Sequence, residues 1–190
     1  SGQGSGGSPP LWLVIWVALS NVLRTEMTGM SFYSPDHSNS TARNNDAFVD
    51  DTTGGVNDTH LSTPLSPTEL AARLQKQAKL WERLLFASGG RLELPKCCFY
   101  MIVWKWTDGD ATMMSVEELN ASISLTCGSN PHPGPIAQKE VHTSHKTLGT
   151  QMNPTGTMTA ETNRLKAKAS TIAAAIERFE GPPWKAHLLY

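Results

Sequence analysis

The sequence predicts an α+β fold, because a strong helix signal and short β-like runs occur in the same stretch of chain. A helix is expected over 67–88, where Ser66 and Glu69 have the spacing of a capping box at its start. Apolar and β-branched residues predict strands over 91–94 and 98–106. A second amphipathic helix is expected over 160–179 near the end of the chain.

The apolar run at 11–19 belongs to a further helix, expected over 10–24. A membrane span needs about 20 apolar residues, so this run is too short to cross a bilayer. The chain also lacks the basic start that a signal peptide would have. The helix is apolar nearly all round, which predicts that it is buried. Loops and turns are expected over 28–46, 107–110 and 128–146.

Composition sets broad limits on function. The chain has 190 residues, of which 39% are hydrophobic, and a net charge of −1, so composition alone does not indicate a nucleic-acid binder. Residues 1–60 carry two basic and six acidic groups, and residues 139–190 carry seven basic and four acidic groups. This asymmetry suits metal binding in the N-terminal part of the chain and polyanion contact in the C-terminal part, although ordinary variation also produces it. Three Cys, two of them adjacent, indicate a reducing compartment.

The segment FVDD at 48–51 places two adjacent carboxylates after two apolar residues. Short apolar residues around a polar pair predict a β-hairpin with Asp50 and Asp51 at its tip. Adjacent acids alone are most often a solvated loop. A pair of carboxylates at a hairpin tip can also bind a divalent cation, because hard cations prefer oxygen ligands.

Four motifs follow one another in an order that resembles the palm of reverse transcriptases, closest to the polymerases of retrotransposons. The family pattern is Q-G-x-x-x-S-P, then aromatic-x-D-D, then a Gly-led segment ending in Lys, then an L-G turn. The matching segments here are QGSGGSP at 3–9, FVDD at 48–51, GGRLELPKC at 89–97 and TLG at 147–149. Each motif alone is weak or moderate evidence, whereas their order and spacing together are more specific.

The resemblance implies a fold and a domain organisation. Residues 1–150 would be the C-terminal part of the palm, an antiparallel sheet packed on helices, without the fingers and the first catalytic strand. Residues 151–190 would begin a helical thumb or connection region. The absence of an initiating Met also indicates a fragment of a longer protein.

The resemblance also implies an activity, namely template-directed nucleotidyl transfer supported by two Mg²⁺ ions, with Mn²⁺ as an alternative cation. The expected partners are an RNA or DNA template with its primer, deoxynucleoside triphosphates, and other parts of a retroelement polyprotein. No membrane partner is expected. The default location for this family is intracellular, in the cytoplasm or within a retroelement particle.

The catalytic roles fall on three residues. Asp50 and Asp51 match the metal-binding carboxylates of the family. Lys96 matches the lysine that could protonate the leaving pyrophosphate or stabilise its charge.

Binding roles fall on five further residues. Gln3, Gly4 and Phe48 match positions that contact the incoming nucleotide or the template, and Gly4 would allow close backbone approach. Leu148 and Gly149 match the turn that holds the end of the primer.

The chain departs from the family pattern at one catalytic position. The family has another Asp on a strand before the Q-G loop, which this sequence, starting at Ser1, does not include. Two carboxylates are expected to hold Mg²⁺ weakly, so the isolated chain is expected to be inactive. The alternative function is a catalytically inactive, truncated relic, or a palm-derived module that binds nucleic acid or protein.

Three other patterns have competing interpretations. Four residues have zinc-binding side chains, but their spacing fits no common zinc site and favours a surface loop: Cys127, His132, His142 and His145. Trp104 and Trp106, with a lysine between them, could be a nucleic-acid platform, although packing on a helix is the favoured interpretation. Basic residues of the last helix could face duplex phosphates or be solvated: Arg164, Lys166, Lys168 and Arg178.

Overall fold

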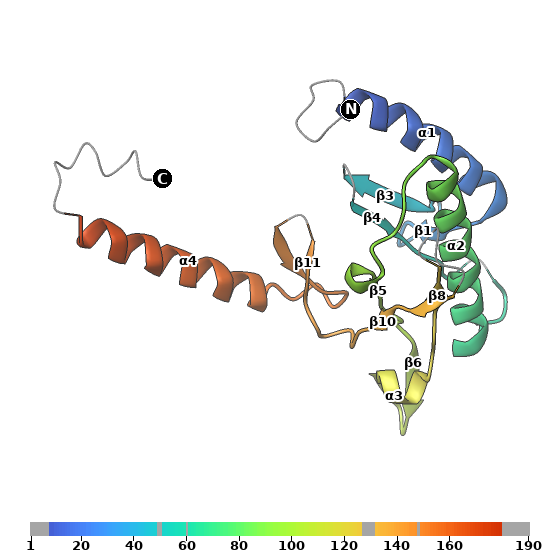
Figure 1. The fold of residues 1–190 in the computed structure, drawn as a ribbon. Coiled ribbons are helices and arrows are strands. Elements are labelled where there is room, and N and C mark those ends of the chain that lie inside the picture. Colours follow the sequence, from blue (N-terminus) through green and yellow to red (C-terminus); the bar gives the residue numbers. More distant parts are fainter. Residues whose placement is uncertain (1–7, 49–50, 60, 127–131, 148, 180–190) are drawn as a thin grey trace. The chain divides into compact units, whose positions relative to one another are not determined.

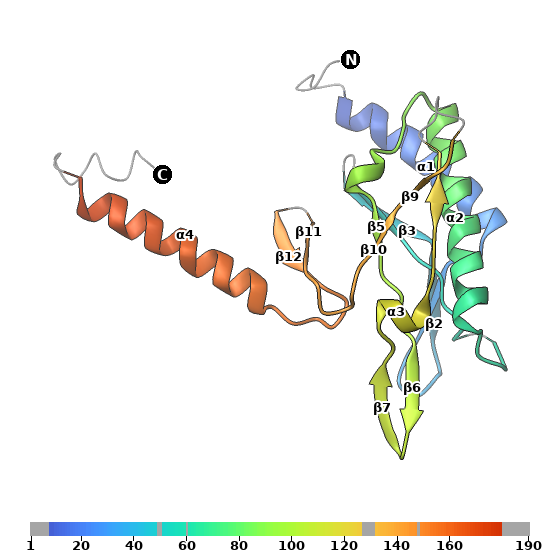
Figure 2. The ribbon, with the colours of Figure 1, turned by 60° about the horizontal axis from the view of Figure 1, so that its bottom comes forward.

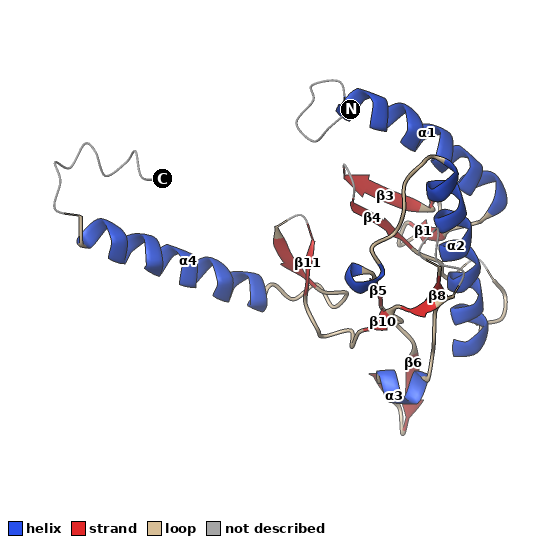
Figure 3. Cartoon of the chain, viewed as in Figure 1, coloured by secondary structure: helices blue, strands red, loops and turns tan. Residues whose placement is uncertain are grey.

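The computed structural model describes residues 8–48, 51–59, 61–126, 132–147 and 149–179. These residues form two compact units, 1–140 and 141–190. The helices are α1 (Ser8–Glu26), α2 (Pro67–Ala87), α3 (Val116–Leu119), α4 (Thr159–Glu177) and the short 3₁₀ helix η1 (Leu94–Lys96). Figure 3 shows helices and short strands interspersed, so the chain is α+β as predicted.

The strands of the described residues pair two by two. Antiparallel pairs are formed by β1 (Met30–Tyr33) with β2 (Ser40–Arg43), β3 (Asn45–Phe48) with β4 (Asp51–Gly54), β6 (Trp104–Thr107) with β7 (Asp110–Met113), β8 (Ser124–Leu125) with β9 (Gly134–Pro135), and β11 (His145–Thr147) with β12 (Thr150–Met152). The short strands β5 (Cys98–Phe99) and β10 (Ala137–Gln138) pair in parallel. A two-stranded pair is marginal on its own, so these sheets depend on packing against other elements.

Helix α2 begins and ends close to where the sequence predicts. Ser66 Oγ accepts a hydrogen bond from the Glu69 amide at 3.3 Å, and the Glu69 carboxylate accepts one from the Ser66 amide at 2.8 Å. These bonds satisfy amides that the first turn leaves without helical partners. At the other end, Gly89 has a φ of +87°, a left-handed conformation that glycine adopts without steric cost.

The core of the first unit lies between α2 and the strands around β5 and β8. Its buried residues are Ala71, Phe99, Met101, Leu119 and Ile123, with Leu70 and Leu74 of α2 packed against them. The Gln75 side chain also exchanges two hydrogen bonds of 2.8 Å with the backbone of Ser124 at the start of β8. These polar contacts align β8 with the helix.

Helix α1 is present over the predicted run, but it is not buried all round. One face of α1 packs on α2 (Figure 2). The Trp16 and Trp81 rings meet there edge-on with centroids 5.4 Å apart, and Leu23 is fully buried. The opposite face is exposed, and Val14 retains 68% of its accessible surface. The prediction was wrong because α2 covers only one face of the helix, although the apolar sequence would allow burial of both.

Residues 28–46, expected as a loop, contain β1, β2 and the start of β3. The Asp36 carboxylate holds the connection between β1 and β2 by accepting hydrogen bonds from Ser34 Oγ at 2.5 Å and from the Ser38 amide at 3.1 Å. The Ser34 hydroxyl is the main reason that the pKa of Asp36 falls to about 2, and Ser38 adds to the effect. Backbone pairing and this turn, rather than apolar periodicity, stabilise the hairpin.

The predicted strands after α2 are also revised. Residues 91–94 form no strand; Leu94 instead begins η1, which contains a proline that cannot donate to a strand ladder. The run 98–106 divides into β5 and the start of β6. The predicted turn at 107–110 is confirmed, and its central residues Asp108 and Gly109 have φ values of +53° and +90°, as a tight two-residue hairpin requires.

Trp104 and Trp106 do not pack on a helix as the sequence analysis favoured. They retain 52% and 74% of their accessible surface on β6. Lys105, between them, forms an ion pair with Glu118 at the start of the short helix α3. Because neighbouring strand residues point to opposite faces, this pairing fixes the lysine face of β6 against α3 and leaves the tryptophan face outside.

The second unit contains the β11–β12 hairpin and α4, which begins within one residue of its predicted start. Glu161 of α4 is buried and accepts hydrogen bonds from Arg164 Nε and from the Gln151 amide of β12, both at 2.8 Å. The bond from Arg164 and then that from Gln151 lower the pKa of Glu161 to about 2. This carboxylate therefore joins the hairpin to the helix.

We expect the link to be lost in acid. Because the pKa of Glu161 is depressed from 4.5, its stabilising effect is complete above about pH 4.5 and is lost as the pH falls through about 2. The Gln151 amide proton should shift in NMR spectra with a midpoint near pH 2. Glu161→Gln should remove that titration, whereas a midpoint near 4.5 in the original chain would contradict the assignment.

Candidate metal-binding hairpin

The two described residues of FVDD, Phe48 and Asp51, lie on paired strands, as the predicted hairpin requires. Strands β3 and β4 pair antiparallel, with Phe48 opposite Asp51. Asp51 begins β4 and is exposed to solvent. Residues 49–50, which connect the two strands, lie outside the described residues. The register therefore brings one of the two predicted metal ligands to the end of the strand pair that adjoins this connection.

The other end of the hairpin is anchored to α2 by buried polar groups. Asn44 Nδ2 donates to the Met27 carbonyl at 3.1 Å, and Gln77 Nε2 of α2 donates to the Asn44 carbonyl at 2.8 Å. Gln77 is only 4% exposed. At Gly54 a Cβ atom would lie 3.1 Å from the Asn44 oxygen and 3.2 Å from Gln77 Nε2, so the close approach favours glycine. Figure 1 shows β3 and β4 in this position next to α2.

Strand β3 begins with two polar residues, and its place in the structure allows this. Asp46 of β3 forms an exposed ion pair of 2.6 Å with Arg43, and its cross-strand neighbour is Thr53. The segment before FVDD, residues 42–47, is polar where a central strand of a buried sheet would be apolar. In the structure β3 pairs with β4 alone, so it does not need the apolar faces of a central strand.

Lys96 lies at the end of η1 and is exposed. Its segment leaves α2 through Gly90, where a Cβ atom would lie 2.8 Å from Leu85 Cδ1, so glycine permits the chain to turn closely over the helix end. Among the described residues, no hydrogen bond or ion pair joins Lys96 to Asp51. The structure therefore places both residues in the first unit without a direct contact.

The other predicted binding residues are only partly described. Four of them lie outside the described residues: Gln3, Gly4, Asp50 and Leu148. Phe48 is described as part of β3 by its backbone alone. Gly149 has a φ of +84° in the turn between β11 and β12, a conformation that favours glycine, and it belongs to the second unit. Their proposed roles stay predictions.

Asp50 and Asp51 supply oxygen donors of the kind that Mg²⁺ and Mn²⁺ prefer. Among the described residues, no three His, Cys, Asp or Glu side chains gather into a group that could hold a metal ion, and Asp50 is not among the residues searched. Cys127, one of the four side chains considered for zinc, also lies outside the described residues.

Asn44 and Gln77, which position the hairpin, carry no motif that marks them in the sequence. A signal was present for Gln77, because it is a polar residue within the apolar face of a strongly capped helix. Buried amides of this kind are normally hydrogen-bonded, so the residue could have been expected to meet a backbone group. Its partner could not be chosen from the sequence, since the pairing joins residues 33 positions apart.

Comparisons with protein-family models, curated proteins and solved structures produced no match. Within the part of the chain that the structure describes, no helix has the length and apolar character needed to cross a membrane.

Proposed function

We propose that this chain is a palm fragment, with the beginning of a thumb, from an RNA-directed DNA polymerase of a retroelement. The observation that carries the proposal is the pairing of β3 with β4, in which Asp51, the last residue of FVDD, begins the second strand. The order of the Q-G, FVDD, Gly-led and L-G motifs supports the same reading. Neither observation depends on the apolar content of the chain, which many α+β proteins share.

The chemistry assigned to the site is nucleotidyl transfer. Two Mg²⁺ ions, when bound, would neutralise the charge that develops on the attacking and leaving oxygens. Asp50 and Asp51 would hold these cations, and an Asp upstream of Ser1 would complete the ligand set. Lys96, exposed on η1, would protonate the leaving pyrophosphate or stabilise its charge.

The partners would be a primed RNA or DNA template, deoxynucleoside triphosphates and other parts of a retroelement polyprotein. Gln3, Gly4 and Phe48 would contact the nucleotide or template, and Leu148 and Gly149 would hold the primer end. We place the protein inside the cell, in the cytoplasm or a retroelement particle.

The second candidate is a non-catalytic palm-derived module that binds nucleic acid or protein. The Arg43–Asp46 ion pair favours this candidate. Asp46 is the acid of the hairpin other than Asp50 and Asp51, and its pairing with Arg43 competes with a role as a third metal ligand. In this case the FVDD segment would keep its hairpin and lose its metal.

Mn²⁺ binding observed by NMR tests the site. Paramagnetic Mn²⁺ should broaden the amide resonances of Asp51 and Thr52 at a concentration about tenfold lower than those of Glu117 and Glu118, because oxygen ligands must be well placed to hold such a cation. Glu117 and Glu118 are a matched pair of adjacent acids on α3, where Glu118 is already bound to Lys105.

Substitutions separate specific binding from general attraction of a cation. Asp50→Asn/Asp51→Asn should remove the early broadening, and Glu117→Gln/Glu118→Gln should leave it unchanged. Equal broadening at both acid pairs, or broadening that survives Asp50→Asn/Asp51→Asn, would count against the metal site.

A further inference from the structure

The solvent face of α2 carries a row of four cations, here called the basic row: Arg73, Lys76, Lys79 and Arg83. Their spacing of three or four residues places them along one side of the helix. This side is opposite the face on which Leu70 and Leu74 pack into the core. Arg73 is half-buried, and the other three side chains are exposed.

The basic row has a cost that an ordinary solvated face avoids. Like charges three or four residues apart on a helix destabilise it by roughly 0.2–0.5 kcal/mol per pair. The two acids of α2 do not offset the repulsion between Lys76, Lys79 and Arg83. Glu69 caps the helix, and Glu82 is buried with its carboxylate bonded to Thr126 Oγ1 at 2.5 Å. Among the described residues, these three cations form no ion pair.

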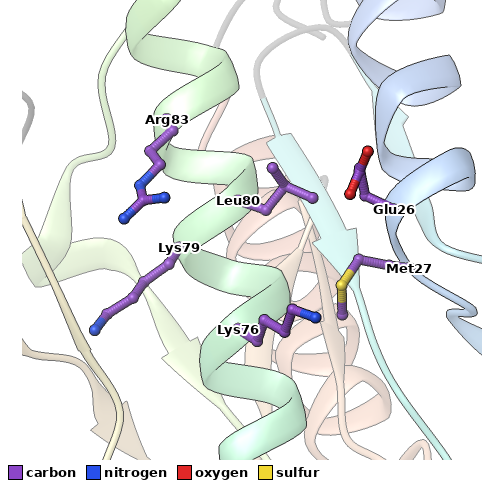
Figure 4. Close-up of a pocket in the computed structure, with 6 residues that line it drawn as sticks. All are labelled: Glu26, Met27, Lys76, Lys79, Leu80 and Arg83. Carbon is purple, nitrogen blue, oxygen red and sulfur yellow. The ribbon is translucent and has the colours of Figure 1, made fainter.

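A shallow pocket of about 220 Å³ lies beside the row, where the end of α1 approaches α2. Its lining combines cations of the row with the apolar side chains Met27 and Leu80 and the carboxylate of Glu26. Figure 4 shows Leu80 pointing toward the side of Met27 and Glu26, whereas Lys79 and Arg83 extend to the other side of the helix. A second pocket of about 230 Å³ shares Glu26, Met27 and Lys76 and continues to Arg73. The two pockets share lining residues and therefore adjoin, and they are here called the groove; Met27 and Leu80 are among its apolar lining and cations of the basic row among its charged lining.

We propose that this groove docks an acidic amphipathic segment of a partner protein. Carboxylates spaced three or four residues apart on that segment would meet the basic row, because this is the spacing of the row itself. A leucine or phenylalanine side chain of the segment would enter between Met27 and Leu80. The charge complementarity would guide association, and the apolar contact would slow dissociation. This docking is independent of the polymerase proposal.

The groove fits a peptide better than it fits a nucleic-acid backbone. Glu26 lines both pockets, so a continuous row of phosphates would pass close to a carboxylate. A peptide can place its charges only where the cations are. The apolar lining formed by Met27 and Leu80 is also matched by an aliphatic or aromatic side chain, which a phosphate backbone does not supply.

Selection from a display library of random 16-residue peptides tests the proposal. The peptides that bind the full chain should be enriched in Asp and Glu together with Leu or Phe. In fluorescence anisotropy, Lys76→Glu/Lys79→Glu should weaken the selected peptides at least tenfold, and Leu80→Ala should weaken them by a smaller factor. Higher salt should also reduce binding, since exposed charges are screened.

Controls separate docking from net charge and from loss of structure. Lys166→Glu/Lys168→Glu makes the same change in net charge on exposed positions of α4 and should leave binding unchanged. If Lys76→Glu/Lys79→Glu fails to fold, Lys76→Gln/Lys79→Gln takes its place, because it adds no charge repulsion. This variant should weaken peptide binding in proportion to the lost charge. The proposal is overturned if no acidic peptide is enriched, if binding survives these substitutions, or if a 20-nucleotide single-stranded RNA binds this groove more tightly than the best peptide.

Discussion

Gly29→Ala is expected to lower the free energy of unfolding by roughly 3 kcal/mol or more, the sum of a strained backbone and a broken buried hydrogen bond. Gly29 has a φ of +66°, and a Cβ atom there would lie 1.9 Å from Asn44 Oδ1 and 2.6 Å from the Arg43 carbonyl. The Arg43 oxygen belongs to the backbone of β2 and cannot move aside cheaply. Displacing Asn44 would disturb its bonds with Met27 and Gln77, which anchor the FVDD hairpin.

Gly109→Ala is the matched control. Gly109 also has a positive φ, of +90°, but a Cβ atom there would meet nothing within 4 Å. Its cost should be only that of the left-handed conformation, about 1–2 kcal/mol. Chemical denaturation followed by circular dichroism would compare the two variants. Equal losses of stability would show that the contact between Gly29 and Asn44 does not matter.

The elements that sequence predicted best are those stabilised by local rules. The Ser66–Glu69 capping box starts α2 through contacts between residues three positions apart, and the turn at Asp108 and Gly109 follows from their tolerance of positive φ. The FVDD hairpin was predicted for a similar reason, since two short runs flank a polar pair. Each signal could be read within a window of a few residues.

Burial was predicted less well, because it depends on which elements meet. The apolar sequence of α1 is compatible with burial on every side, yet α2 covers one face and leaves Val14 exposed. The alternation in β6 predicts that Trp104 and Trp106 share a face. It does not show that Lys105 and Glu118 turn the other face toward α3. Long-range pairing decided both outcomes.

The candidate site was predictable in part for the same reason. Asp50 and Asp51 could be selected by residue type and motif order. The groups that hold their hairpin, Asn44 and Gln77, are far apart in sequence and carry no motif. The relation of Lys96 to Asp51 depends on the path of η1, whereas the sequence predicted a strand over 91–94 and no helix at Lys96. Motifs therefore suggest a chemistry, which stays a proposal, whereas the contacts that support the hairpin required the structure.

In a chain extended upstream to include the fingers and the Asp-bearing strand, Asp50→Asn/Asp51→Asn is expected to reduce template-directed DNA synthesis about a thousandfold, the equivalent of roughly 4 kcal/mol in the barrier. Asparagine keeps the size and shape of the side chain but removes the negative charge that holds a divalent cation. Asp51 is exposed, so its substitution should leave the free energy of unfolding nearly unchanged. Glu117→Gln/Glu118→Gln removes an equal charge on α3 and should leave synthesis intact.

Primer extension on an RNA template with Mg²⁺ tests the central claim most directly. It should be measured for this chain and for a chain extended upstream to include the fingers and the Asp-bearing strand, each with and without Asp50→Asn/Asp51→Asn. The account predicts that the extended chain synthesises DNA, that the double substitution abolishes the synthesis, and that this chain alone is inactive. A correctly folded extended chain that makes no product, or one that is unaffected by the double substitution, would contradict it.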